Sequence, residues 1–475
     1  MRLLEPGEVA YEAALASLFH GEAAAASPAA VAQPATPEEV IAALAWARER
    51  SLPVCVRSGS HSRFCARDGS LVLDASRFLG RITVAEGTVR LGAGATMGAV
   101  LEALAPHGLA LSVGTHPTPG LGLVLQGGIG HLSRSQGLTI DRIREIHGVR
   151  PADGAPLAIN AQGWIGTPPP DGGDPARLWT LLRGAAPFLA VVTEVVLEPL
   201  PRVPLQVQRA LHRLDDLEAV LSCAERLPRG CSCSLVLADR PDAPGAVALS
   251  FAVACDEGGR SALAQLSGDW TAAGAAPVLA GPWSVEAAGL EGCPPFDLPR
   301  SDGSTPEPPP PARDRHGRDR TQIFSLLLPA GQVAQGLAER LRRAAAAAPN
   351  RSCRIDLQHL GGAVAAVPPM ATAFAGRAAE WSVVITALWA ADDHAMAALA
   401  ADWAEACFLA LEPLACGLYI TERHPEASLA ERELRLAFGE HLESLRALRR
   451  VWDPGGLLPP LLKNACAMDA PEGSS

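Results

Sequence analysis

Residues 112–141 read SVGTHPTPGLGLVLQGGIGHLSRSQGLTID, and this stretch decides how the rest of the chain is interpreted. Seven glycines and two prolines lie between Val113 and Leu138. Backbone without side chains can approach a ligand closely, and successive amides can surround a phosphate or diphosphate. No Gly-Lys-Ser or Gly-Lys-Thr occurs, and the dinucleotide-binding Gly-x-Gly-x-x-Gly pattern fits poorly. Glycine content alone leaves a cofactor cradle and a long structural loop equally open.

A mixed α/β unit surrounds this stretch. Residues 36–50 (TPEEVIAALAWARER) predict a helix, because Thr36 is a suitable N-cap and Glu39 stands three residues after it. Further elements are expected as a strand before the Arg57 turn, strands at 71–78, 88–94 and 189–198, and a short helix capped by Thr96. Pro-Leu-Pro follows the last of these strands and predicts a domain boundary near residue 200.

The second half of the chain again alternates strand-like and helix-like segments. Strands are expected at 231–239, 246–254, 381–390 and 417–421, and helices at 330–348, 394–411 and 429–452. Residues 299–320 are rich in proline and charge and predict an exposed loop, either a lid or, preferably, an inert insertion.

Composition excludes several classes of function. The chain has 475 residues and a formal net charge of −11, so it lacks the clustered cations that nucleic-acid binding requires. Lys463 is the only lysine, which makes Schiff-base chemistry in a pocket improbable. Cys231 and Cys233 have no second pair at zinc spacing, so no metal site is expected, and the two read as same-face strand residues.

The cysteine count and the hydropathy of the chain bear on its cellular location. Eleven scattered cysteines fit free thiols in a reducing compartment better than a disulfide framework. No run of 18 apolar residues occurs and the first residues lack a signal-peptide pattern, so a cytoplasmic protein without a membrane partner is expected. The oligomeric state stays open.

Two stretches, taken together, indicate a family that neither indicates alone. VRSGSHS (56–62) followed by the glycine-rich residues 114–141 resembles the FAD-binding domain of the vanillyl-alcohol oxidase/p-cresol methylhydroxylase (PCMH) superfamily, with berberine bridge enzyme-like oxidoreductases as the nearest branch. The resemblance continues, in order, through 177–194, 360–377 and 438–454, so it touches nearly the whole chain.

This resemblance implies an α+β, two-lobed protein. It places a PCMH-type FAD-binding domain at 1–200, a substrate domain with an antiparallel sheet and covering helices at 201–414, and a segment at 415–475 that returns to the FAD lobe. It implies an FAD-dependent oxidoreductase that oxidises an alcohol or C–H bond of a small molecule, such as a sugar or secondary metabolite, by hydride transfer to flavin N5. The acceptor would be oxygen or another oxidant, and Pro119 leaves oxidase versus dehydrogenase open.

The resemblance also assigns cofactor residues. Arg57-Ser58-Gly59-Ser60-His61 matches a turn whose amides hold the FAD diphosphate and whose histidine commonly bonds to the flavin 8α-methyl group. His116 stands where doubly linked members carry a cysteine, so covalent attachment through His61 only is expected. The further residues expected around FAD are Gly114, Thr115, Thr118, Gly120, Gly122, Gly127, Gly128, Gly130 and Val192. Residues 185–190 replace family glycines and restrict the backbone there.

The catalytic side of the resemblance is weaker. The family's Tyr-x-Asn appears as Tyr419-Ile420-Thr421, so Tyr419 is the candidate base if cations or the flavin lower its pKa, with His116 as a second proton acceptor or a packing substitute. The strand at 381–389 offers only Ser382 and Thr386 as polar interior residues, and an ordinary apolar sheet face is the favoured interpretation. Leu138, Asp141 and Arg377 match family positions that are expected to be structural.

Two alternatives remain open. The apolar strand and the lost asparagine fit a flavin-binding protein that has lost oxidation chemistry and serves a non-redox or scaffold role. The altered residues 185–190 are the support for a chain that binds no flavin. The retained His61 turn favours oxidation chemistry over both.

Overall fold

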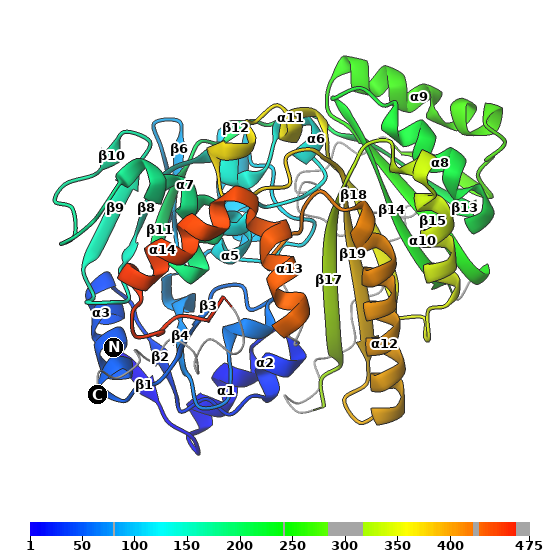
Figure 1. The fold of residues 1–475 in the computed structure, drawn as a ribbon. Helices are drawn as coiled ribbons and strands as arrows, with labels where there is room; N and C mark the ends of the chain where they lie inside the picture. The colour runs from blue at the N-terminus through cyan, green and yellow to red at the C-terminus, as the bar shows by residue number, and fades with distance from the viewer. Residues whose placement is uncertain (79–80, 241–242, 284–316, 421–426, 462–475) are drawn as a thin grey trace.

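The computed structural model describes residues 1–78, 81–240, 243–283, 317–420 and 427–461. Figure 1 shows two lobes side by side. We call residues 1–200 and 415–461 the N-terminal lobe and residues 201–414 the sheet lobe. The blue, cyan and red segments lie in the first, the green and orange ones mostly in the second, and yellow α11 (Gly362–Ala365) lies beside α6 (Ser133–Gln136) of the N-terminal lobe. The fold is therefore α+β with two lobes, as expected. Most of the proline-rich loop, Thr421 and Lys463 lie outside the described residues.

The first sheet of the N-terminal lobe has the strand order β1-β2-β4-β3, with β2, β3 and β4 parallel (β1 Arg2–Leu4, β2 Ala30–Gln33, β3 Val54–Arg57, β4 Leu71–Asp74). Its helices are α1 (Val9–Ala16), α2 (Gly21–Ala25) and α3 (Pro37–Glu49). Helix α3 starts where predicted, because Thr36 Oγ1 accepts a hydrogen bond from the Glu39 amide at 3.3 Å.

The second sheet has the order β10-β9-β8-β11-β6-β5 (β5 Ile82–Ala85, β6 Thr88–Gly92, β8 Ile143–Val149, β9 Pro156–Asn160, β10 Gly163–Trp164, β11 Val191–Leu197). The short strands β7 (Leu109–Ala110) and β12 (Leu200–Pro201) form a separate pair. The helices are α4 (Met97–Leu104), α5 (Leu121–Gln126), α6 (Ser133–Gln136) and α7 (Pro175–Ala185). The predicted cap of α4 is present, since Thr96 Oγ1 accepts from the Ala99 amide.

The sheet lobe contains one antiparallel sheet of seven strands in the order β16-β13-β15-β14-β18-β19-β17 (β13 Gln206–Arg213, β14 Cys231–Arg240, β15 Ala243–Ala254, β16 Leu279–Trp283, β17 Arg320–Pro329, β18 Arg354–His359, β19 Ala379–Trp389). Helices α8 (Leu217–Glu225), α9 (Glu257–Ala272), α10 (Leu337–Ala346) and α12 (His394–Leu411) pack on this sheet, and α11 (Gly362–Ala365) adjoins α6.

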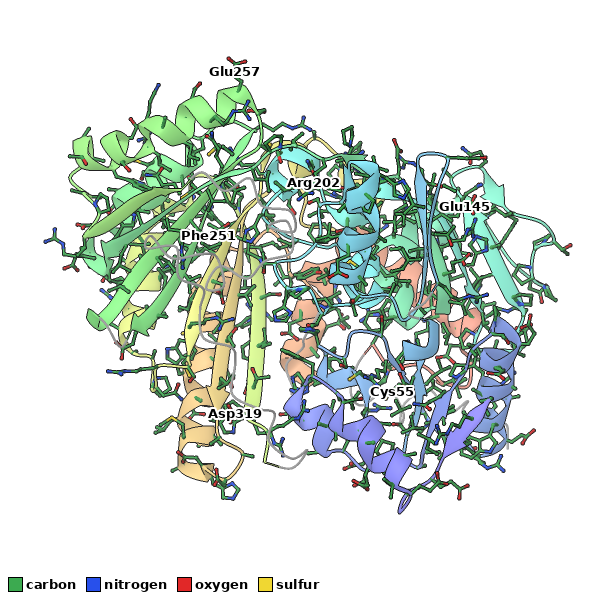
Figure 2. The ribbon with its side chains drawn as sticks, turned by 180° about the vertical axis from the view of Figure 1, so that it is seen from behind. Cys55, Glu145, Arg202, Phe251, Glu257 and Asp319 are labelled. Carbon is green, nitrogen blue, oxygen red and sulfur yellow. The ribbon has the colours of Figure 1, made fainter. Side chains whose placement is uncertain are left out.

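One face of this sheet is covered by helices and the other faces the N-terminal lobe. Phe324 of β17 contacts Phe408 of α12 with ring centroids 5.4 Å apart, which identifies the helix-covered face. Cys231 and Cys233 belong to the same apolar core, as their spacing on a strand predicted. On the opposite face, Phe251 (Figure 2) meets His131 of the N-terminal lobe edge-on at 5.1 Å. The face toward the N-terminal lobe is therefore the only one of the two that helices leave accessible to a ligand.

Three predicted elements are wrong in detail. Residues 418–420 form no strand, and Gly417 makes only a single bridge to Leu327. The long C-terminal helix is two helices, α13 (Ala427–Phe438) and α14 (Leu442–Trp452), because Gly439 adopts a φ of +49° between them. The predicted 330–348 helix becomes regular only at α10, after Gly336 at a φ of +83°. In each case a backbone feature overrides an apolar or helical pattern.

Helix α12 and the turn after it (His394–Leu414) are long and apolar enough to cross a membrane by length and composition alone. The helix packs against β17 and β19 (Figure 1), and Trp403, Phe408 and Leu411 belong to the core cluster. Packing inside the protein buries 33% of this apolar window.

Candidate functional site

The turn after β3 and the glycine-rich loop interlock. Strand β3, marked by Cys55 in Figure 2, ends at Arg57, whose guanidinium pairs with the buried Asp74 carboxylate at 3.0 Å. A Cβ on Gly59 would lie 2.3 Å from the Gly120 amide nitrogen, and a Cβ on Gly120 would lie 2.0 Å from Ser58 Oγ. Both positions therefore require glycine, and the two loops meet backbone to backbone.

Ser58 joins these loops to the second sheet. Its hydroxyl donates to the Ala93 carbonyl at 2.6 Å and accepts from the Leu121 amide at 3.0 Å. Ser60 has a φ of +57°, and its hydroxyl accepts from the Phe19 amide at 3.0 Å. The residues predicted for the diphosphate turn thus form one fixed unit, held in place from three directions.

The other predicted glycines divide into two groups. Gly122 has open space on its Cβ side and lines a cavity. A Cβ on Gly128 would lie 2.1 Å from Thr139 Oγ1, and a Cβ on Gly130 would lie 1.7 Å from the Val113 carbonyl. Gly114 and Gly127 likewise face protein atoms, on Leu123 and Tyr419 respectively. These four glycines shape the loop by close packing, so their link to a cofactor is indirect.

The cavity lies between the interlocked loops and the C-terminal segment. It is mostly apolar, and its wall includes Val192, one of the residues expected around FAD, together with Pro187, which does not close the space. The lining residues are Val56, Ser58, Ser62, Phe64, Cys65, Ala93, Leu121, Gly122, Leu125, Gln126, Pro187, Phe188, Ala190, Val192, Ile420 and Pro459. A cavity of this composition suits an extended, largely apolar organic group.

The C-terminal segment is fixed on this cavity by an Asp-Pro turn. Asp453 accepts hydrogen bonds from the Leu457 and Leu458 amides at 2.7 and 2.9 Å. Arg449 donates to the carbonyls of Phe188 and Pro459 at 3.1 and 2.8 Å. The family-like ending therefore closes one wall of the cavity.

The turn residues fit a bound diphosphate. In the described part of the chain, the backbone amides of Gly59, Ser60 and His61 donate to no protein acceptor. Unsatisfied backbone donors are costly unless water or a ligand accepts from them. Successive amides beside a glycine form an anion-binding concavity, so the residues present match the diphosphate of FAD.

Three side chains contact the predicted attachment point, His61. His61 stacks on Phe19 with ring centroids 4.0 Å apart and meets His116 edge-on at 5.2 Å. Thr118 Oγ1 lies between the two imidazoles, 2.5 Å from His61 Nε2 and 2.7 Å from His116 Nδ1. Burial, together with the smaller electrostatic effects of His116 and His20, lowers the pKa of His61 to about 3. His61 is therefore a neutral imidazole at physiological pH.

The structure places Tyr419 in a setting opposite to the one that a base requires. Its hydroxyl accepts from the Gly128 amide at 3.3 Å, and its ring packs against Phe374. Burial raises the pKa of Tyr419 to about 12, because no cation beside the hydroxyl offsets desolvation in the described part of the chain. Among the described residues no contact joins Tyr419 to His116, so the two predicted catalytic groups do not form one unit.

The sheet face that points toward the N-terminal lobe carries a polar group that the sequence analysis did not identify. Asp356 of β18 lies in register with Val384 of β19, and Val384 with Ser325 of β17. Ser325 Oγ donates to the Tyr419 carbonyl at 2.6 Å, which places this rung on the side of the N-terminal lobe. Two strand spacings separate Asp356 from Ser325, or about 10 Å.

Asp356 has a cationic neighbour, since Arg354 Nε lies 2.9 Å from its carboxylate. Ser382 and Thr386 occupy the same face, as even-numbered residues of β19. The signal was present in RIDLQH (354–359), where Arg354, Asp356 and Gln358 alternate with apolar residues. The family resemblance points to the neighbouring strand at 381–389, which carries no acidic residue between Trp381 and Trp389.

The comparisons with known proteins agree with this geometry. Residues 28–160 match the FAD binding domain family. The (R)-6-hydroxynicotine oxidase of Paenarthrobacter nicotinovorans is 34% identical over 182 residues, which are 37% of this chain and 37% of that protein. The matched stretch thus spans about two fifths of the curated relatives.

Two solved structures extend the likeness to the whole fold. The Physcomitrella patens BBE-like 1 protein superposes with a TM-score of 0.75 at 20% identity and covers 97% of this chain and 96% of its own. The glucooligosaccharide oxidase of Acremonium strictum, described as carrying 6-S-cysteinyl, 8α-N1-histidyl FAD, superposes with a TM-score of 0.74 at 20% identity, covering 96% and 95%. Residues 28–160 therefore resemble an FAD binding domain, and the whole chain has the fold of the BBE-like 1 protein and of the glucooligosaccharide oxidase.

Proposed function

We propose that this protein is an FAD-dependent oxidoreductase that oxidises an alcohol or C–H bond of a small molecule. The observation that carries the proposal is the turn at 57–61, whose unsatisfied amides at residues 59–61 and half-buried, neutral His61 stand beside a large apolar cavity. Relatives are named for oxidation of 6-hydroxynicotine and of glucooligosaccharides, which supports a small organic substrate without identifying it.

The bound cofactor supplies a hydride acceptor, and the chain supplies binding and proton handling. The amides of residues 59–61 hold the diphosphate, and Ser58 keeps the two loops in contact. His61 anchors the flavin covalently and alone, because His116 stands where a second, cysteinyl bond would need a thiol. The electron acceptor is oxygen or another oxidant.

The proton released by the substrate goes to a group on the sheet lobe. We assign this role to Asp356, because its carboxylate oxygens can accept a proton and the strand register places it on the sheet face toward the N-terminal lobe. Arg354 orients that carboxylate from one side. Tyr419, whose pKa is about 12, keeps its proton and fixes the loop at Gly128 instead. The substrate then lies between this sheet face and the flavin.

A cytoplasmic location is also part of the proposal. It is supported by the odd number of cysteines and by free thiols at the nine cysteines that the structure describes. A scaffold role without oxidation chemistry would leave His61 and its hydrogen-bonded neighbours without a purpose, so oxidation is preferred.

The test uses purified full-length protein. A visible spectrum shows whether flavin is present, and acid precipitation followed by in-gel fluorescence shows whether it is covalent. Wild type is expected to keep its colour in the pellet, and His61→Ala to lose it. Flavin released from wild type would contradict covalent attachment, and a colourless protein that ignores added FAD would contradict the cofactor itself.

A further inference from the structure

We propose that Thr118 and His116 prepare His61 for attachment of the cofactor: they fix which ring nitrogen of His61 carries the proton, and they take that proton away when the bond forms. The inference rests on the proposed function, because it concerns the bond between His61 and FAD. It gives His116 a definite task as a positioning residue.

A backbone donor fixes the protonation of His116 Nδ1. The Thr118 amide donates to His116 Nδ1 at 3.3 Å, and an amide can only donate. His116 Nδ1 is therefore unprotonated and acts as an acceptor. The Thr118 hydroxyl, 2.7 Å from the same nitrogen, must also donate to it.

The Thr118 hydroxyl has only one proton, and it donates that proton to His116 Nδ1. Thr118 Oγ1 lies 2.5 Å from His61 Nε2, so in this contact the oxygen accepts and Nε2 donates. Because His61 is neutral, a proton on Nε2 leaves the lone pair on Nδ1. The chain of hydrogen bonds thus selects Nδ1 as the nucleophile.

The surroundings hold this arrangement. Phe19 stacks on the imidazole of His61 at an interplanar angle of 18°, and its own amide is bound by Ser60, so the ring plane of His61 is fixed. The charges that reach His61 come from His20 and His116, and both disfavour its protonation. His116 is half-buried, which gives it access to solvent.

Formation of the bond between His61 and the flavin removes two protons and two electrons. Nδ1 of His61 forms a bond to the 8α carbon of the flavin, and that carbon loses a C–H proton to solvent. The two electrons of the broken C–H bond remain on the flavin ring and pass to dioxygen, which is reduced to hydrogen peroxide. The Nε2 proton moves to Thr118 Oγ1 while the hydroxyl proton of Thr118 moves to His116 Nδ1, so no charge stays on the half-buried imidazole of His61. His116 then releases the proton to solvent.

The test measures covalent incorporation, not turnover. Full-length protein made under riboflavin limitation is mixed with FAD in air, and intact mass follows the covalent fraction with time. Thr118→Val removes the hydroxyl and is expected to slow incorporation about 100-fold, in the range of general acid–base effects. Thr118→Ser restores the hydroxyl and should restore a rate within a few fold of wild type.

His116→Asn separates orientation from proton transfer. Its amide oxygen can accept from both Thr118 donors but cannot hold a proton, so slow incorporation is expected. Wild-type incorporation in Thr118→Val, or in His116→Asn, would overturn the relay while leaving the proposed function intact. FAD bound non-covalently by wild type would instead defeat the covalent attachment itself, and the relay with it.

A second readout does not depend on flavin. Long-range ¹H–¹⁵N spectra of the cofactor-free chain report the tautomer of each histidine. We expect His61 in the Nε2–H form in wild type and Thr118→Ser, and a mixture of tautomers in Thr118→Val. The Nδ1–H form in wild type would refute the inference.

Discussion

Asp141 of the N-terminal lobe and Arg377 of the sheet lobe form a bidentate ion pair across the lobe boundary. Arg377 Nη1 and Nη2 lie 2.9 and 2.6 Å from the two carboxylate oxygens, and Nη2 also donates to Thr372 Oγ1 at 2.8 Å. Asp141 accepts in addition from the Leu138 amide at 3.0 Å, which closes the turn after the glycine-rich loop. The pair therefore fixes the cofactor loop and the facing lobe relative to each other.

Breaking this pair should destabilise the protein strongly. Arg377 is 1% exposed, and removing one partner of a buried pair costs about 3–5 kcal/mol. We expect Arg377→Met to lower the midpoint of thermal unfolding by several degrees. Arg351→Met, which breaks the exposed pair with Asp239, is the control and should change it little. Equal midpoints for both variants would show that the lobes do not depend on the Asp141 contact.

Features that depend on neighbouring residues could be predicted from the sequence, whereas contacts between residues far apart in the chain could not. The cap at Thr36 and the turn at 57–61 follow from short patterns, and the structure contains both. The assignment of Asp141 and Arg377 as structural agrees with their ion pair. That they bind each other could not be inferred, because 236 residues separate them and only the fold brings them together.

Tyr419 shows that a match to a sequence motif does not reveal the protonation state of a side chain. Its position matched a family motif, but its protonation depends on burial, which arises from packing by Gly127 and Phe374. A single sequence does not reveal that environment. Asp356 was available in principle through its alternation with apolar residues, although only the strand register shows which face it occupies.

The close approach of the two loops predicts a strong effect at Gly59. An alanine there would place its Cβ 2.3 Å from the Gly120 nitrogen, so the loops must separate and FAD affinity should fall at least tenfold. Gly268→Ala, on α9 with nothing within 4 Å of a Cβ, is the matched control and should bind FAD normally. Fluorescence titration with FAD measures both variants in a His61→Ala background, where no covalent bond can form, and unchanged affinity in Gly59→Ala would remove this contact from the cofactor site.

The assignment of the proton acceptor predicts a contrast between two conservative variants. Asp356→Asn should slow reduction of bound flavin by substrate about 100-fold, because a general base is lost, whereas Tyr419→Phe should change it by less than tenfold. Stopped-flow absorbance of the flavin measures both, with covalent flavin content as the check that the site is intact. A large loss in Tyr419→Phe together with a normal rate in Asp356→Asn would reverse the assignment.

Buried neutral histidines predict that the protein loses stability in mild acid. Burial lowers the pKa of His212 to about 4 from 6.5, and its Nε2 contacts Ser250 Oγ at 3.0 Å inside the sheet lobe. The unfolded chain therefore binds a proton at His212 between pH 6.5 and 4 that the folded chain excludes, so stability is complete above pH 6.5 and falls as the pH drops through that window. His359, whose pKa is lowered to about 4, acts in the same direction. Thermal midpoints between pH 7.5 and 4 should fall less steeply in His212→Gln than in wild type, and parallel profiles would show that His212 is not a source of the acid sensitivity.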